Sequence, residues 1–313
     1  MVMHTRPFDW RDLPQLHRYR NETLFLNSAL LLTRGPLQTL GAMVSSVVPS
    51  LGVFTSVYEP DEASARPLIG QVLHEAGAAF AYLAFLAPDS ELGTQKLPSL
   101  IEHLLGQIAG RGVLRVLAEL DEHSLAVEGL RRAGFAVYTR QRVWRLAQSS
   151  NGGSVPAGWR TANQGDVFAV RTLYASLVPG LVQQVEDTSL DEPKGLVYYR
   201  EGELRAYVEL RYGLMGIWAR PYVHPDYEAA TADLIRLLQN LPSRHIRPVY
   251  VAVSSYQSWL DGVLEDLGAT TSQRQVFMAK HLAVHKKLEP SLAITGLEGQ
   301  SERFALVKKA ETR

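Results

Sequence analysis

Three side chains that can accept a proton lie close together late in the first half of the sequence. Glu119, Asp121 and His123 fall at and just beyond the end of an apolar run that predicts a buried strand. A carboxylate or an imidazole at such a position can serve as a general base. The same residues also fit a solvated loop that leads into a helix N-cap, and the sequence leaves both interpretations open.

A second stretch, VHPDY at 223–227, predicts a strand end that runs into a loop and a helix. Such a junction often binds phosphate, because a helix N-terminus offers unpaired N–H groups and the positive end of its dipole. Here the loop and expected first turn contain Glu228 and Asp233 and lack glycine. Acidic residues stabilise a helix N-terminus without any ligand. We therefore expect no anion at this junction, and an unusual anion site is the alternative.

The composition describes a globular protein and excludes several kinds of site. The 313 residues suggest about two domains. The 32 basic residues balance the 32 acidic ones, so we expect no nucleic-acid partner. The chain has no cysteine, which removes disulfides, thiolate nucleophiles and Cys-ligated metals. His281 and His285 have no third ligand nearby in sequence, so no metal site is expected.

The sequence also bears on location. The charged N-terminal stretch lacks the apolar core of a signal peptide. The longest nearly apolar stretch, 76–88, is shorter than the roughly 20 residues that a membrane-spanning helix needs. The lack of cysteine fits a reducing compartment. These features predict a cytoplasmic protein without a membrane partner, and they leave the oligomeric state open.

The two halves of the sequence repeat one pattern on either side of a linker rich in Ser, Gly and Pro at 148–158. An Arg is followed by an Asp six residues later near the start of each half, at Arg6 and Asp12 and again at Arg160 and Asp166. Both Asp residues are placed to cap the helix that follows. The segments 121–146 and 255–280 align without a gap at a constant shift, which places Gln141 opposite Gln275.

Each half therefore predicts the element order β-α-β-β-β-α-β-α-β. Strands interleaved with helices imply an α/β fold, a twisted mixed sheet of about six strands in each half. We expect an N-terminal domain at 1–147, the linker at 148–158, a C-terminal domain at 159–284 and a tail at 285–313.

This order, with a helix, a Gly-Phe pair and a last strand in AVEGLRRAGFAVYTRQRVW, resembles the GCN5-related N-acetyltransferase (GNAT) family. The resemblance covers both halves and implies two tandem GNAT-like domains. It also implies acetyl-CoA in a V-shaped gap between two parallel central strands. The pyrophosphate would lie on the helix that follows the fourth strand, where the family carries the motif Q/R-x-x-G-x-G/A.

If the chain binds acetyl-CoA, the resemblance favours the first half over the second as the site. Leu86 and Ala87 end the fourth strand, where the family pairs its backbone with the pantetheine arm. Gly93, Thr94 and Lys96 would then approach the pyrophosphate just before the next helix.

Several positions depart from the family pattern. In the first half Pro98 withholds an N–H and Ile101 replaces a small residue. In the second half the motif falls on acidic residues and its glycines are gone. The family's usual Tyr, which protonates the departing thiolate, is replaced by Leu130 and Leu264.

Two functions follow from the resemblance. The first is an acetyl-CoA-dependent N-acetyltransferase that acts on an amine of a small molecule or peptide. In that function Glu119, Asp121 and His123 are the candidates to take the amine's proton. The alternative is a catalytically inactive GNAT-like protein that binds a ligand or a partner protein. The departures in the motifs favour the alternative, whereas the enzymes of the family favour the first.

Overall fold

The computed structural model describes residues 5–35, 52–60, 65–148, 153–186, 192–226 and 230–282. Three parts of the sequence-based prediction lie outside the described residues: the tail at 285–313, residues 149–152 of the linker, and Glu228. Residues 1–282 form one compact unit.

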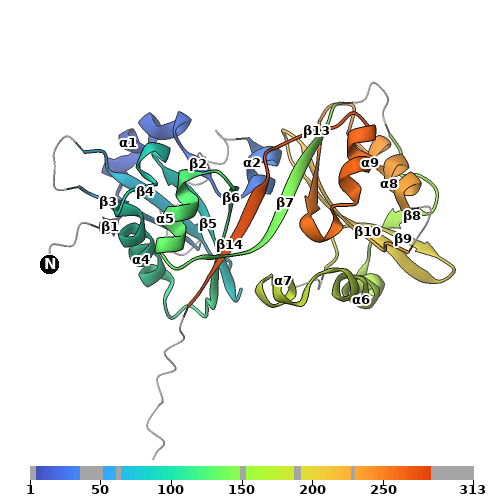
Figure 1. The fold of residues 1–313 in the computed structure, drawn as a ribbon, viewed down its shortest axis with the longest axis horizontal. Coiled ribbons are helices and arrows are strands. Elements are labelled where there is room, and N and C mark those ends of the chain that lie inside the picture. Colours follow the sequence, from blue (N-terminus) through green and yellow to red (C-terminus); the bar gives the residue numbers. More distant parts are fainter. Residues whose placement is uncertain are drawn as a thin grey trace, which may run out of the picture. The chain divides into compact units, whose positions relative to one another are not determined.

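The first half follows the predicted order of elements (Figure 1). Its strands are β1 (Thr5–Pro7), β2 (Leu24–Phe25), β3 (Val53–Tyr58), β4 (Leu68–Leu73), β5 (Phe80–Ala87), β6 (Arg115–Asp121) and β7 (Ala136–Leu146). Its helices are α1 (Leu13–Arg18), α2 (Ser28–Arg34), α4 (Lys96–Ile108) and α5 (Leu125–Arg132).

The second half repeats that order. Its strands are β8 (Trp159–Thr161), β9 (Gly195–Arg200), β10 (Glu203–Tyr212), β11 (Ile217–Val223), β12 (Val249–Ser254), β13 (Thr270–Thr271) and β14 (Gln275–His281). Its helices are α6 (Val167–Leu177), α7 (Gly180–Val185), α8 (Ala230–Gln239) and α9 (Leu260–Asp266), and a 3₁₀ turn, η6 (Ser255–Gln257), precedes α9.

Strand pairing confirms the repeat. In the first half β1, β3, β4 and β5 pair antiparallel in turn, and β5 then pairs parallel with β6. In the second half β8, β9, β10 and β11 do the same, and β11 pairs parallel with β12. The two halves therefore share one topology, as the aligned segments predict.

The last strands of the two halves are exchanged, and this joins the halves into one sheet. The sheet order among the described residues is β1-β3-β4-β5-β6-β14-β7-β12-β11-β10-β9-β8. Thus β7 of the first half pairs with β12 of the second, whereas β14 of the second half pairs with β6 of the first. In Figure 1 β7 and β14 cross between the halves. The sequence predicts a separate sheet in each half, whereas the exchanged strands join both halves into one sheet. The boundaries of the two domains stay a prediction.

The exchange brings the repeat-related glutamines together at the centre. Gln141 and Gln275 are paired residues in the antiparallel β7–β14 ladder. The Gln141 side-chain amide donates a hydrogen bond of 2.9 Å to the Gln275 side-chain oxygen. Because residues that the repeat relates meet each other, a pseudo-twofold axis passes through this pair.

Each half has its own apolar core on one face of the sheet. Helices α4 and α5 pack on the strands of the first half, and α8 and α9 pack on those of the second. Leu130 on α5 and Leu264 on α9 are fully buried in these two cores. The position of the family's usual Tyr is therefore part of the packing in both halves.

The Arg–Asp pattern at the start of each half forms the same ion pair twice. Arg6 donates to both carboxylate oxygens of Asp12, at 2.7 and 2.8 Å. Arg160 donates to both of Asp166, at 2.7 and 2.6 Å. Each Asp also accepts the backbone N–H three residues earlier, in a reciprocal capping box. Asp12 and Asp166 directly precede α1 and α6 as predicted, but neither side chain caps its helix. Each binds backward instead, and the capping side chains of the first turns are Asp9 and Asn163.

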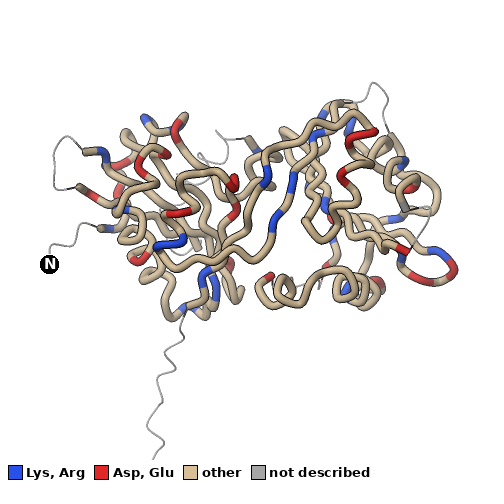
Figure 2. Tube along the Cα trace, viewed as in Figure 1, with Lys and Arg blue, Asp and Glu red and all other residues tan. Residues whose placement is uncertain are grey.

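Charges of both signs are interspersed along the described parts of both halves (Figure 2). Among those residues no helix is long and apolar enough to cross a membrane. No group of three or more His, Asp or Glu side chains in the same residues could hold a metal ion.

Replacing Asp166 with Asn should lower the free energy of unfolding by about 2–3 kcal/mol, because it weakens charge-assisted bonds to a buried side chain. The Arg160 guanidinium holds the pKa of Asp166 well below its usual range. Wild type should therefore lose this stability as the pH falls below about 4, and the variant should not. Urea unfolding between acidic and neutral pH measures both effects. An unchanged midpoint for Asp166→Asn would contradict the account, and Asp9→Asn, a conservative change at a cap on the surface, is the control.

Candidate functional site

The two central parallel strands of the first half separate partway along their length. β5 and β6 are paired only at 80–82 and 115–117. Beyond this point β5 and β6 are no longer paired. This matches the V-shaped gap that the resemblance to the GNAT family predicts. The backbone groups of both strands that face the gap then need other hydrogen-bond partners.

The chain itself supplies those partners in the first half. β2 enters the gap and pairs antiparallel with β5, with Leu24 opposite Leu86. The Leu26 N–H donates to Ala84 O at 2.9 Å, and the Glu119 N–H donates to Leu26 O at 3.2 Å. Leu26 is 1% exposed. The segment 24–26 thus lies as a short strand between β5 and β6.

The predicted cofactor residues of the first half lie around this filled gap. Leu86 and Ala87 end β5 as predicted, and both are fully buried. Gly93 and Thr94 lie in the turn before α4, and Lys96 is the first residue of that helix.

Lys96 and Thr94 both contact Glu91, which lies just before this turn. The Lys96 ammonium pairs with Glu91 at 2.7 Å, and the Thr94 hydroxyl donates to Glu91 O at 2.7 Å. Their role in binding a cofactor stays a prediction.

In the second half the two parallel strands separate in the same way, but a side chain and not a backbone segment lies between them. β11 and β12 are paired only from Ile217 to Ala219 on the first strand. Past the split, Gln257 of η6 reaches the free edge of β11. Its amide nitrogen donates to Pro221 O at 2.8 Å, and its amide oxygen accepts from Val223 N–H at 3.0 Å. Gln257 is 3% exposed, so a buried side-chain amide takes the place of a neighbouring strand.

The helix that follows this gap begins at Ala230. Asp233 lies in its first turn as predicted, is buried, and contacts Arg236 at 3.4 Å. The other predicted acid of this junction, Glu228, lies outside the described residues.

The structure separates the three predicted general bases. Glu119 is buried near the pseudo-twofold axis, where it accepts a hydrogen bond of 2.7 Å from Gln141 and one of 3.3 Å from Ser28 N–H. His123 is exposed in the turn before α5, and its backbone N–H donates to the carboxylate of Asp121 at 2.8 Å. Asp121 ends β6, and His123 lies in the loop before α5, whose N-cap is Ser124. A catalytic role for all three stays a prediction.

Glu119 belongs to a polar network that joins the halves. Gln275 donates to the Ser28 hydroxyl at 2.8 Å, and Ser28 begins α2 beside its N-cap Asn27. Burial raises the pKa of Glu119, and hydrogen bonds from Ser28 only partly oppose that effect. The carboxylate therefore positions the start of α2 against the exchanged strands.

A cluster of charged and aromatic side chains near the second gap was not identified from the sequence as a site. Arg220 on β11 contacts Glu186, just past α7, at 3.3 Å. The Tyr138 hydroxyl donates to Glu186 at 3.2 Å, and Tyr222 and Tyr256 interact electrostatically with Arg220. The sequence gives two signals for it: the aromatic residues of the second half, which mostly fit sheet packing, and the segment 176–189, which the resemblance places over the acceptor side.

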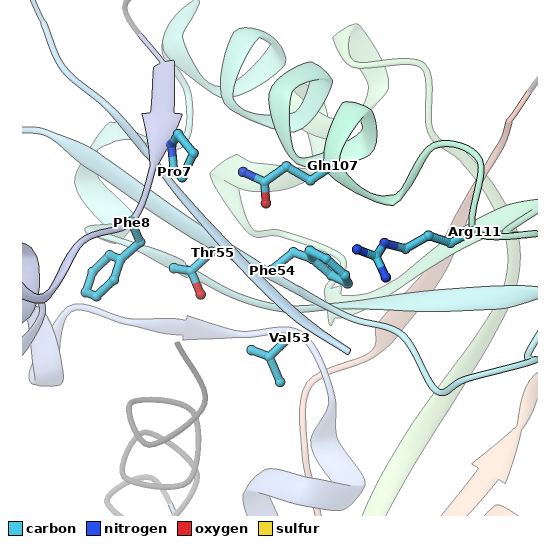
Figure 3. Close-up of a pocket in the computed structure, with 7 residues that line it drawn as sticks. All are labelled: Pro7, Phe8, Val53, Phe54, Thr55, Gln107 and Arg111. Atoms are coloured by element: carbon cyan, nitrogen blue, oxygen red, sulfur yellow. The ribbon is translucent and has the colours of Figure 1, made fainter. Parts of the chain in front are cut away.

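A separate pocket of about 260 Å³ lies at the outer edge of the first half (Figure 3). The Arg111 guanidinium lies 4.7 Å from the centre of the Phe54 ring, toward which its side chain points. β4 separates this edge from the split between β5 and β6, so the pocket is not part of the gap. Its lining is Pro7, Phe8, Val53, Phe54, Thr55, Gln107 and Arg111.

Replacing Glu119 with Gln should change how stability depends on pH. Because the pKa of Glu119 is raised, ionisation costs more in the folded chain than in the unfolded one. The free energy of unfolding of wild type should therefore fall as the pH rises above about 4.3, and the variant should lack this contribution. Urea unfolding at several pH values measures the difference, with the exposed Glu128→Gln as control. A difference between Glu119→Gln and wild type that stays constant with pH would refute this account.

No family model matches this sequence, and no curated protein matches it. Solved structures do match its fold. A GCN5-related N-acetyltransferase from Sphaerobacter thermophilus is 14% identical and has a TM-score of 0.53, over 88% of this chain and 95% of its own. A tandem GNAT protein from the clavulanic acid biosynthesis pathway is 14% identical, with a TM-score of 0.49 over 88% and 98%.

A GNAT acetyltransferase from Colwellia psychrerythraea is 15% identical, with a TM-score of 0.44 over 89% and 99%. We infer the fold from the Sphaerobacter structure, whose TM-score exceeds 0.5, and from the strand pairing. The chain has the GNAT acetyltransferase fold, repeated in tandem.

Proposed function

We propose that this chain is a non-catalytic ligand-binding protein built on two tandem GNAT-fold halves. One observation carries the proposal: in both halves the chain itself occupies the strand edge that the family leaves to the pantetheine arm. Leu24 to Leu26 take that edge in the first half, and Gln257 takes it in the second.

The residues of the first gap do not fit acyl-CoA. The cofactor would have to remove a buried backbone segment with its hydrogen bonds to Ala84 and Glu119. Exposing Leu26 alone costs about 1.5–3 kcal/mol, and each lost hydrogen bond adds roughly 0.5–1.5 kcal/mol. Lys96, the cation expected to meet the pyrophosphate, is paired with Glu91 instead.

The missing proton donors support the same function. A departing thiolate needs a proton, and the family's Tyr supplies it. Leu130 and Leu264 lie at those positions, buried in the two cores, and neither can donate one. Asp233 also adds negative charge to the first turn that would face a pyrophosphate in the second half.

The competing function is an acetyl-CoA-dependent N-acetyltransferase that acts on a small amine or a peptide. One observation favours it in the second half, because a side chain closes that gap and a side chain can rotate away. The pantetheine amides could then replace the two hydrogen bonds of Gln257. The competing function therefore requires measurable acetyl-CoA affinity.

Calorimetry of wild type with acetyl-CoA tests the proposed function. We expect no heat of binding at about 1 mM ligand, equivalent to a binding free energy weaker than about −4 kcal/mol. Micromolar binding would overturn the proposal. Loss of that binding in Lys96→Glu, but not in Lys194→Glu, an exposed lysine with the same charge change, would place the cofactor in the first half.

Replacing Gln257 with Ala tests how the second gap is held closed. The change leaves Val223 N–H and Pro221 O without partners, and each unpaired group costs about 1–3 kcal/mol. We expect the unfolding free energy to fall by about 2–4 kcal/mol, whereas Gln184→Ala at the surface should have little effect. Thermal unfolding measures both variants, and equal melting temperatures would show that the amide does not support the strand edge.

A further inference from the structure

The pocket of about 260 Å³ at the outer edge of the first half, which we call the Arg111 pocket, lies where β1 stops covering β3 (Figure 3). β1 pairs with β3 from Ser56 to Tyr58 only. One more hydrogen bond follows, from Phe8 N–H to Thr55 O at 3.0 Å. The chain then turns away into a capped 3₁₀ segment. β1 therefore does not reach Val53 and Phe54, which line the pocket.

The lining of the Arg111 pocket combines an apolar surface with one cation. Four of its seven residues are apolar, and two of these, Phe8 and Phe54, are buried. None of the seven is acidic, and Arg111 alone carries a charge. Gln107 is held in place, because its amide donates to the Ser56 hydroxyl at 3.0 Å. A ligand in this pocket would meet apolar walls and an unopposed positive charge.

The Arg111 guanidinium is accessible. Its side chain is exposed, and among the described residues it makes no ion pair and no hydrogen bond, only the contact with the Phe54 ring. The residues on either side, Gly110 and Gly112, have φ of +81° and +83°, and an added Cβ would have open space at both. Such φ values favour glycine. The shape of the turn, which presents Arg111 at the pocket, is therefore what these glycines serve.

The second half provides an internal comparison for Arg111. Arg244 lies in the corresponding turn, after α8 and before β12. Its guanidinium donates to Leu238 O at 3.0 Å and to Ala147 O at 3.4 Å. Arg244 thus uses its donors to hold the end of its own helix and the end of the first half. Arg111 has no such structural task among the described residues.

The walls of the pocket also differ between the halves. The offset that relates Arg6 to Arg160 places Ala162 opposite Phe8. The Ala162 N–H donates to Gly195 O at 3.0 Å, as Phe8 N–H does to β3. β9 begins at Gly195, so the second half has neither the aromatic wall nor the two further strand residues. The repeated fold does not require these features, which points to a role in binding.

We propose that the Arg111 pocket binds a small carboxylic acid with an apolar body. The carboxylate accepts hydrogen bonds from the Arg111 guanidinium, which can form two parallel N–H···O bonds with it, and the body lies against Phe8 and Phe54. A cationic ligand would be repelled by Arg111. The proposal rests on the proposed function, because it names the class of ligand for a non-catalytic protein.

The volume of the pocket limits the size of the acid. At about 260 Å³ it is smaller than the pockets of roughly 300–1,000 Å³ that hold drug-sized ligands. A single ring or a short branched chain with one carboxylate fits this limit. Aromatic walls favour a flat ring, so phenylacetate is a suitable probe.

Calorimetry with three probes of similar size tests the charge of the ligand. Phenylacetate is the acid, phenylacetamide the neutral analogue and phenethylamine the cation. We expect phenylacetate to bind wild type with a dissociation constant of about 1 mM or lower, and the other two at least about tenfold more weakly. A smaller preference for the acid would overturn the proposal, as would no phenylacetate binding at about 10 mM.

Variants locate the binding. Arg111→Gln should weaken phenylacetate at least about tenfold, because it removes the charged fork that pairs with the carboxylate. Arg131→Gln, with the same charge change at an exposed arginine on α5, should bind as wild type does. Val53→Trp should abolish binding, because the indole occupies the pocket. Circular dichroism shows which variants fold. Unchanged phenylacetate binding in either folded pocket variant would reject the site.

The proposed function and this site fail separately. Acetyl-CoA binding in the same calorimeter would overturn the non-catalytic function and leave the phenylacetate measurements standing. Without acetyl-CoA binding, loss of the preference for the acid would overturn the Arg111 pocket alone.

Discussion

The antiparallel pairing of β7 with β14 joins the two halves of the chain at the centre of one sheet. Each strand ends one half, and each also pairs with a strand of the other half. The exchange makes a single sheet from two repeats and brings Gln141 and Gln275 together. Gln141 from the exchanged β7 also donates to the buried Glu119 carboxylate. Glu119 in turn accepts from Ser28 N–H at the start of α2, and its own N–H donates to Leu26 O in the segment that fills the first gap.

A second constraint acts where two parallel strands separate. Buried backbone N–H and C=O groups at the split must be paired, and a ligand arm pairs them in the family that the chain resembles. In this chain the buried backbone groups at the two splits are paired in two different ways. A backbone segment meets it at Ala84 and Glu119, and a side-chain amide meets it at Pro221 and Val223. Two different solutions to one demand are what the proposed non-catalytic function requires.

Features that depend on neighbouring residues could be predicted from the sequence. The positions of Asp12 and Asp166 just before a helix, a helix close to Lys96 and the repeated order of elements all follow from spacing along the sequence. The filling of the gaps could not be predicted, because Leu24 meets Leu86 and Gln257 meets Val223 only in the folded chain. A buried carboxylate and a catalytic one look alike in sequence, so the sequence could suggest Glu119 as a general base but not its buried contacts with Gln141 and Ser28.

The exchange also explains how the charged and aromatic side chains around Arg220 come to lie together. Arg220 lies just past the split of β11 and β12, on a strand edge that a separate domain would expose to solvent. Tyr138 reaches Glu186 from β7, which belongs to the first half and pairs with β12 of the second. The exchanged strand thus carries a residue of one half into the polar cluster of the other. A buried charge persists only where such partners surround it, so the cluster around Arg220 depends on both halves of the repeat.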